Sequence, residues 1–138
     1  MQGARVIRLA DTEVVPLGVG SDYRPIVGDD AGTTPVRTGI QTCMPGYEVP
    51  PHCHPYTEII HVLDGALEFW MDAAENETVV LHRGDTIEIQ PGAWHGFRVN
   101  GNQTARLLGT HVSPRRIVQY KAVVEVYARG YRTKRTKP

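Results

Sequence analysis

Apolar and polar residues alternate with a period of two along the central part of the chain. In residues 36–44 a β-branched residue occupies every second position from Val36 to Thr42. Successive side chains of a strand point to opposite faces, so this pattern predicts a β-strand. Similar short segments recur at intervals of roughly ten residues, which favours a sandwich or small barrel of six or more strands. The predicted strands cover residues 36–44, 58–63, 66–71, 78–81, 86–89, 95–99 and 105–112.

Turns that contain Gly or Pro separate these segments. Pro45 and Gly46 end the first strand, and Pro91 and Gly92 mark a later turn. The pair at positions 64 and 65 is Asp-Gly and lies between two apolar runs. An Asp-Gly pair in this position is a strong hairpin signal, because both turn residues need a positive φ. We therefore predict that the strands on either side of this pair form a β-hairpin.

The two ends of the chain differ from the central part. Residues 1–34 are rich in turn formers from position 16 onward, which predicts an N-terminal arm and loop with at most one short pairing segment. The barrel is expected over residues 35–114, and residues 115–138 form a C-terminal extension. Residues 117–127 are apolar and β-branched, which favours a strand or a dimer-exchanged arm and leaves a short helix open. Residues 129–138 contain basic but no acidic residues, which predicts a solvated, frayed tail.

Composition fits one folded domain and excludes several classes of protein. The chain has 138 residues, with 15 Lys and Arg against 15 Asp and Glu. This balance gives no reason to expect nucleic acid or an anionic membrane as the partner. No apolar run approaches the ~20 residues of a transmembrane helix. The N-terminal stretch lacks the apolar core of a signal peptide, and Cys43 and Cys53 make no disulfide framework. We therefore expect a reduced, cytoplasmic protein.

Three histidines and one glutamate form the candidate functional site. His52 and His54 are two residues apart, so on a strand both imidazoles point to the same face. Glu58 has the same parity if the chain stays extended, and His95 follows a turn on a later strand. Three imidazoles and one carboxylate suit a divalent transition-metal ion, and an octahedral ion keeps two further positions for water, oxygen or a substrate.

The spacing of these residues resembles the cupin superfamily. The first cupin motif is matched at all five of its positions, and the second at its Gly, Gly and His positions. In the second motif Gln90 and Val99 stand where the family has Pro and Asn. These two differences affect a turn and the end of a strand, and they leave the metal ligand unchanged. The matched residues are Gly46, His52, His54, Glu58 and Gly65 in the first motif and Gly84, Gly92 and His95 in the second.

The resemblance implies an all-β fold, a cupin-type antiparallel β-barrel or jelly roll in a single domain. It also implies that His52, His54, Glu58 and His95 bind one divalent ion, with Fe, Mn, Ni and Zn as the candidates. Cupins are commonly dimeric, and antiparallel barrels have edge strands that must be covered. We therefore expect a homodimer that acts on a small molecule.

Further polar residues are candidates for contact with a substrate. Tyr56 and His111 are the candidate catalytic residues, because Tyr56 follows the first ligands and a late barrel strand that carries His111 can face the pocket. Arg37, Arg98 and Arg106 lie on predicted strands, where an inward guanidinium would bind a carboxylate and an outward one would be solvated. Residues of the inward parity are expected to line the barrel near the ion: Ile60, Val62, Leu67, Phe69, Phe97 and Val99.

Other residues that could bind a metal ion or a ligand are expected to lie outside the site. His61 has the opposite parity to Glu58, and His82 lies beside a turn. Cys53 should point away from the two flanking histidines, and Cys43 is expected to be a small core residue. Trp94 precedes the ligand turn and either borders the mouth of the barrel or packs against it.

The resemblance predicts fold and metal better than reaction, since cupins include enzymes, storage proteins and sensors. The intact ligand set favours a metal-dependent enzyme, with dioxygenase (oxidoreductase) or lyase chemistry. A non-catalytic cupin that binds or senses a small ligand is the alternative, as is a sugar isomerase or epimerase.

Overall fold

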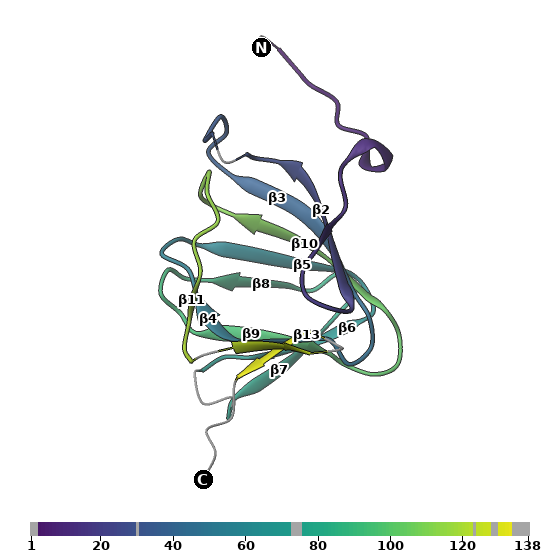
Figure 1. The fold of residues 1–138 in the computed structure, drawn as a ribbon, viewed down its shortest axis with the longest axis vertical. Helices are drawn as coiled ribbons and strands as arrows, with labels where there is room; N and C mark the ends of the chain where they lie inside the picture. Colours follow the sequence, from purple (N-terminus) through teal and green to yellow (C-terminus); the bar gives the residue numbers. More distant parts are fainter. Residues whose placement is uncertain (1–2, 30, 73–75, 123, 128–129, 134–138) are drawn as a thin grey trace.

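Two β-sheets face each other and enclose one core in the computed structural model, which describes residues 3–29, 31–72, 76–122, 124–127 and 130–133 (Figure 1). One sheet has the order β1 (Val15–Pro16), β2 (Ser21–Val27), β3 (Arg37–Cys43), β10 (Ala105–His111), β5 (Glu58–Asp64), β8 (Thr86–Ile89). The other has the order β12 (Val124–Tyr127), β13 (Gly130–Thr133), β4 (Glu48–Cys53), β9 (His95–Val99), β6 (Ala66–Trp70), β7 (Thr78–His82), with β11 (Gln119–Tyr120) paired to β4. The predicted all-β jelly roll is confirmed.

The core lies between the two sheets and is built from alternate residues of the facing strands. In β5 the buried positions are 58, 60 and 62, as the period-two pattern predicts. Val62, Leu67 and Phe69 are completely buried, so they fill the core and do not line an open pocket. The inward parity predicted for the six apolar residues is confirmed: Ile60, Val62, Leu67, Phe69, Phe97 and Val99 are all buried.

The predicted hairpin at Asp64–Gly65 is wrong. The strand that ends at Asp64 pairs with β10 and β8, whereas the strand that starts at Ala66 pairs with β7 and β9 in the other sheet. The chain therefore crosses between the sheets at Gly65, whose φ is +73°. A Cβ at Gly65 would lie 2.8 Å from the Thr104 carbonyl oxygen, so the corner also needs the small residue for close packing.

We expect Gly65→Ala to lower the free energy of unfolding by more than about 2 kcal/mol, because a left-handed backbone costs about 1 kcal/mol and the close backbone contact adds to it. Gly101→Ala is the matched control, since Gly101 has φ +91° but no atom of the described residues within 4 Å of its Cβ position. Urea unfolding of both variants measures the difference. Equal losses would show that the contact with Thr104 has no energetic importance.

The N-terminal region is more ordered than an arm with loops. Ser21–Val27 forms a seven-residue strand that pairs along β3, so it is an integral part of the first sheet. A short 3-10 helix, η1 (Leu9–Asp11), precedes it. The prediction of a pairing segment in this region was therefore correct, but the strand is longer than predicted.

The C-terminal extension returns to the barrel of its own chain. Gln119–Tyr120 pairs with Cys53 and His52 of β4, and Val124–Tyr127 forms a hairpin with Gly130–Thr133. The prediction of a strand is confirmed and the short helix is wrong, while exchange of the arm between protomers stays a prediction. Residues 130–133 form a strand where a frayed tail was expected, whereas residues 128–129 and 134–138 lie outside the described residues, as do 73–75 of the expected loop. The homodimer stays a prediction.

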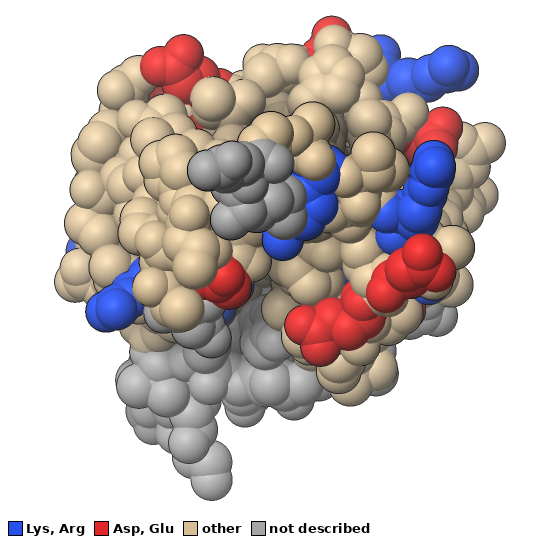
Figure 2. All heavy atoms as spheres, turned by 90° about the horizontal axis from the view of Figure 1, so that it is seen from above, with Lys and Arg blue, Asp and Glu red and all other residues tan. Residues whose placement is uncertain are grey.

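The described surface shows no strong bias of charge on the face seen in Figure 2. Acidic and basic groups are interspersed there over a mostly tan surface. Among the described residues, no helix has the length and apolar character that crossing a membrane requires.

Candidate metal centre

Four side chains converge at one end of the barrel interior. His52 lies near the end of β4, His54 just beyond it, Glu58 begins β5 and His95 begins β9. His52 and His95 are directly opposed partners on neighbouring strands. All four residues are buried, and one ligand atom from each lies within 4.8 Å of those of the others. The structure thus brings together the four residues predicted from the sequence.

Backbone carbonyl groups orient all three imidazoles. The Nδ1 atoms of His52 and His95 each lie 2.9 Å from a carbonyl oxygen, of Pro50 and Ala93 respectively. The Nδ1 atom of His54 lies 2.6 Å from the carbonyl oxygen of Ile117. A carbonyl oxygen only accepts hydrogen bonds, so each Nδ1 carries the proton and donates. In the neutral form of such a ring Nε2 is unprotonated, and this is the atom that a metal ion binds.

The Glu58 carboxylate lies beside these Nε2 atoms. Its Oε2 atom is 2.7 Å from His54 Nε2 and 3.3 Å from His95 Nε2. Despite these short distances, Glu58 Oε2 and His95 Nε2 are buried without a hydrogen-bond partner of acceptable geometry among the described residues. Buried polar atoms are rarely left in this state. A divalent ion bound between them would satisfy both, so the residues present fit a metal site.

Burial and mutual contacts shift the pKa values of the site. Desolvation, with a further contribution from His95, lowers the pKa of His52 to about 3, so this imidazole stays neutral at ordinary pH. Burial by itself would raise the pKa of Glu58, but contacts with His111, His54 and His95 together hold that pKa well below its usual range. A neutral imidazole beside an ionised carboxylate is the protonation state that binds a cation.

Tyr56 and His111 lie next to this cluster, as do groups of the C-terminal extension. His111 Nε2 is 3.6 Å from Glu58 Oε1, and His111 Nδ1 is 2.5 Å from the Tyr56 hydroxyl. The Ile117 amide donates to the same hydroxyl at 3.2 Å, and the Tyr56 ring stacks on His54. Ile117 therefore contacts both His54 and Tyr56 through its backbone. Sequence reasoning missed this role, because a backbone carbonyl has no signal in a residue pattern.

Comparison with known protein families gives one match that decides the family. Residues 39–111, just over half of the chain, match the family described as the cupin domain. The chain belongs to the cupin family. The match covers His52, His54, Glu58, His95 and His111, whereas Ile117 lies beyond it. A comparison with curated protein sequences gives no significant match for this cupin.

Solved structures show the same fold. The polyketide cyclase RemF from Streptomyces resistomycificus has a TM-score of 0.74 at 21% identity, with 91% of each chain covered. An RmlC-like cupin from Shewanella frigidimarina has a TM-score of 0.68 at 21% identity, covering 84% of this cupin and 96% of that chain. An oxalate oxidase has a TM-score of 0.61 at 26% identity, covering 74% of this cupin and 55% of that chain.

The residues expected outside the site of this cupin do lie outside it. The His61 imidazole bonds to Thr86 on the surface at 2.7 Å, and His82 is exposed. Cys53 is directed toward Gln119 on β11, and Cys43 is completely buried in the core. Trp94 is half-buried, with the Lys121 ammonium 5.3 Å from its ring centre.

The three arginines on strands take different positions. Arg98 pairs with Glu68 at 2.9 Å, and Arg106 lies 3.7 Å from Asp64, so both guanidinium groups belong to the outer surface. Arg37 is half-buried and donates to the Pro114 carbonyl at 3.4 Å, beside the loop that carries Ile117. Parity along the strand places Arg98 and Arg106 outward, whereas Arg37 lies directly opposite His111.

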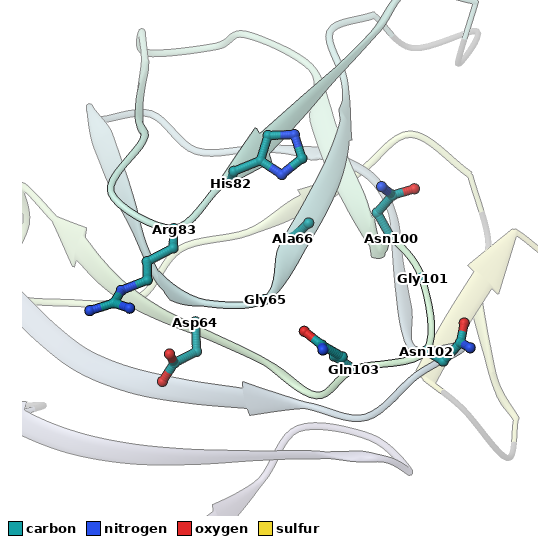
Figure 3. Close-up of a pocket in the computed structure, with 9 residues that line it drawn as sticks. All are labelled: Asp64, Gly65, Ala66, His82, Arg83, Asn100, Gly101, Asn102 and Gln103. Carbon is teal, nitrogen blue, oxygen red and sulfur yellow. The ribbon is translucent and has the colours of Figure 1, made fainter.

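A polar hollow of about 660 Å³ lies at the other end of the barrel from the metal centre. Figure 3 shows the side chains that line it. Strand β5 places Glu58 in the metal centre and Asp64, six residues later, at the hollow. At about 3.3 Å per residue, these two positions are roughly 20 Å apart. The hollow contains none of the candidate ligands; it is lined by Asp64, Gly65, Ala66, His82, Arg83, Asn100, Gly101, Asn102 and Gln103.

The metal-free protein is expected to lose stability as the pH falls from about 6.5 toward 3. In the unfolded chain His52 titrates near 6.5, whereas in the folded protein it stays neutral down to about 3. The unfolded state therefore binds more protons in this window, and the free energy of unfolding falls by up to about 1.4 kcal/mol per pH unit. Glu58 adds a loss of the same sign below its unfolded value of 4.5.

Thermal unfolding between pH 7.5 and 4 in the presence of a chelator measures this dependence. The His52→Gln variant should show a shallower fall of Tm between pH 6.5 and 5. An unchanged slope in that variant would show that His52 is not the group responsible.

Proposed function

We propose that this cupin is a metal-dependent enzyme in which His52, His54, Glu58 and His95 bind one divalent first-row ion, and which acts on a small organic molecule. One observation carries the proposal. Three Nδ1 atoms are held by backbone carbonyl groups, so three Nε2 atoms and one carboxylate oxygen are directed at a common point. Backbone anchoring of this kind is typical of metal ligands.

The bound ion would act as a Lewis acid toward a substrate oxygen or as a centre for oxygen chemistry. The rest of the site supports proton transfer. Burial raises the pKa of Tyr56, so its hydroxyl stays protonated. In the tautomer of His111 that carries the proton on Nε2, toward Glu58, the Nδ1 atom accepts a hydrogen bond from this hydroxyl. We infer that His111 exchanges a proton with a substrate held at the centre, because its side chain is still 18% exposed beside the buried cluster.

This Tyr56–His111 pair favours lyase-type or cyclase-type proton chemistry within the proposal. The similarity to the polyketide cyclase RemF supports the same direction through the fold. Dioxygenase chemistry is the second candidate, supported by the ligand set itself and by the similarity to an oxalate oxidase. The two differ in one observable, which is the consumption of oxygen.

The test loads the protein with Fe²⁺, Mn²⁺, Ni²⁺ or Zn²⁺ and screens small carboxylates, diketones and catechols. Substrate loss and dissolved oxygen are followed together. On any substrate that is converted, His111→Gln is expected to lower kcat by about 100-fold or more without changing metal affinity, because a general acid–base group contributes at least this much. His61→Gln, on the outer face, is the control and should keep full activity.

Two results would contradict the proposal. A ligand that copurifies and binds equally well after the metal is removed would identify a binding module. Full activity of the metal-free protein would show that the ion is not required. Interconversion of an aldose and a ketose without oxygen uptake would redirect the assignment to a sugar isomerase.

A further inference from the structure

Residues 113–121, which follow β10, form a strap that docks on the part of β4 nearest the metal centre. Within the strap, Gln119–Tyr120 pairs with Cys53 and His52 as strand β11, which Figure 1 shows beside β4. The Lys121 amide continues this pairing and donates to the carbonyl of the residue before His52 at 3.1 Å. One candidate ligand therefore lies directly opposite a residue of the strap.

The middle of the strap contacts a second ligand through its backbone. The Ile117 carbonyl oxygen lies 2.6 Å from His54 Nδ1, and the Ile117 amide donates to the Tyr56 hydroxyl at 3.2 Å. The Ile117 side chain is 51% exposed, so these contacts do not depend on its burial. The backbone of one residue thus connects the strap to a ligand imidazole and to the tyrosine ring that stacks on it.

The strap itself has little that holds it in place. Every residue from 113 to 121 is exposed or half-buried, so the strap contributes no side chain to the buried core. Segments with few buried apolar contacts open locally at a free energy well below that of global unfolding. The hydrogen bonds at the ligands therefore strongly affect how much of the time the strap stays docked.

A cation at His54 would stabilise one of these hydrogen bonds. A neutral imidazole has a single N–H, which lies on either Nδ1 or Nε2. With the hydrogen on Nε2, the Nδ1 atom of His54 would be an acceptor that faces the carbonyl oxygen of Ile117, and the two atoms would repel each other. A metal ion bound to Nε2 excludes that tautomer, so Nδ1 keeps its hydrogen and donates to the strap.

We propose that Ile117 is a positioning residue of the metal centre, and that docking of the strap and binding of the ion favour each other. This inference rests on the proposed function. Because linkage is reciprocal, the factor by which the docked strap raises metal affinity equals the factor by which the ion favours docking. The strap therefore opens more readily in the metal-free protein, where its opening uncovers the buried His52 and His54 to an incoming ion.

Amide hydrogen exchange with and without Zn²⁺ measures docking. The amides of Ile117 and Lys121 are the reporters, because both donate to groups outside the strap. Zn²⁺ is expected to slow their exchange by about 10-fold or more, since groups that orient a ligand change metal affinity by this amount. The Asp85 amide, which donates to the His82 carbonyl in a turn at the other end of the barrel, is the control. Its exchange should change by less than about two-fold.

Variants of the strap test the same coupling through the affinity for Zn²⁺. Lys121→Pro removes the amide hydrogen that bonds to β4, whereas Lys121→Gln keeps it and is the matched control. Lys121→Pro is expected to raise the Kd for Zn²⁺ by about 10-fold, and the control by less than about three-fold. Tyr56→Phe, which removes the acceptor of the Ile117 amide, should also raise it several-fold. If Lys121→Pro fails to fold, an unchanged Kd in Tyr56→Phe would overturn the coupling.

The outcomes separate this inference from the proposed function. If Zn²⁺ binds but the Ile117 and Lys121 amides exchange equally fast with and without it, the coupling is refuted and the metal centre stands. Equal affinities of Lys121→Pro and Lys121→Gln would lead to the same conclusion. If Zn²⁺ does not bind, the proposed function fails, and His54→Phe in the metal-free protein still tests the anchor, because it keeps an aromatic ring without the N–H. Faster exchange at Ile117 in that variant would support the anchor, and unchanged exchange would overturn it.

Discussion

Replacing His95 by Gln is expected to lower the affinity for Zn²⁺ by more than about 100-fold. Changes to groups that only orient a metal ligand already cost 10-fold to 100-fold, so loss of a ligand should cost at least the upper value. His95 is 3% exposed, and its Nε2 atom has no hydrogen-bond partner among the described residues. The proposed ion would satisfy this atom. The variant also removes the one candidate ligand that β9 supplies, directly opposite His52 of β4.

Competition with a chromophoric chelator measures this affinity directly. His61→Gln is the matched control, because it removes an imidazole that bonds to Thr86 on the outer surface. The control should bind Zn²⁺ as the unmodified protein does. If His95→Gln bound the ion within about three-fold of the unmodified protein, His95 would not be a ligand and the four-residue centre would be wrong.

Replacing Glu58 by Gln is expected to lower turnover on the true substrate by on the order of 100-fold beyond any loss of bound metal. The variant keeps the shape of the side chain but removes the one negative charge that the structure places among the three imidazoles. The charge of the ligands tunes the acidity of a bound ion, so the remaining occupied sites should react more slowly. The carboxylate is also the group that His111 Nε2 faces at 3.6 Å.

The measurement is kcat per metal-loaded molecule, with metal content determined on the same sample. Glu68→Gln is the control, since Glu68 pairs with Arg98 on the outer face of the barrel. Its kcat should be unchanged. Activity of Glu58→Gln that simply follows metal occupancy would show that the carboxylate only retains the ion, and ligand binding that follows occupancy in the same way would favour a binding module over an enzyme.

Local patterns in the sequence determined the strands and the four residues of the centre. Period-two alternation predicted β3, β5 and β9 because side chains alternate across a strand whatever strand lies beside it. The same rule placed His52 and His54 on one side of the chain and His61 on the other side from Glu58. The cupin spacing added His95, and all four residues converge in the structure.

The pairing of the strands was decided only by the tertiary structure. Asp64 and Gly65 carry the local signal of a hairpin, yet the chain crosses to the other sheet there, because β5 and β6 each find their partners elsewhere. A turn signal reports a change of direction and does not report which strand the chain meets next. For the same reason, the sequences of the N-terminal and C-terminal regions did not predict the length of β2 or the pairing of β11 with β4.

The surroundings of the centre were likewise decided by long-range register. Parity within the strands already directs Arg98 and Arg106 outward, but only the pairing of β3 with β10 and β5 shows that Arg37 lies in the row that contains His111 and Glu58. The carbonyl of Ile117 reaches His54 from 63 positions away along the chain. Spacing within one segment determines which residues share a face, whereas contacts between distant segments depend on how the sheets pack. The sequence by itself therefore determined the four candidate ligands, and the fold decided which groups orient them.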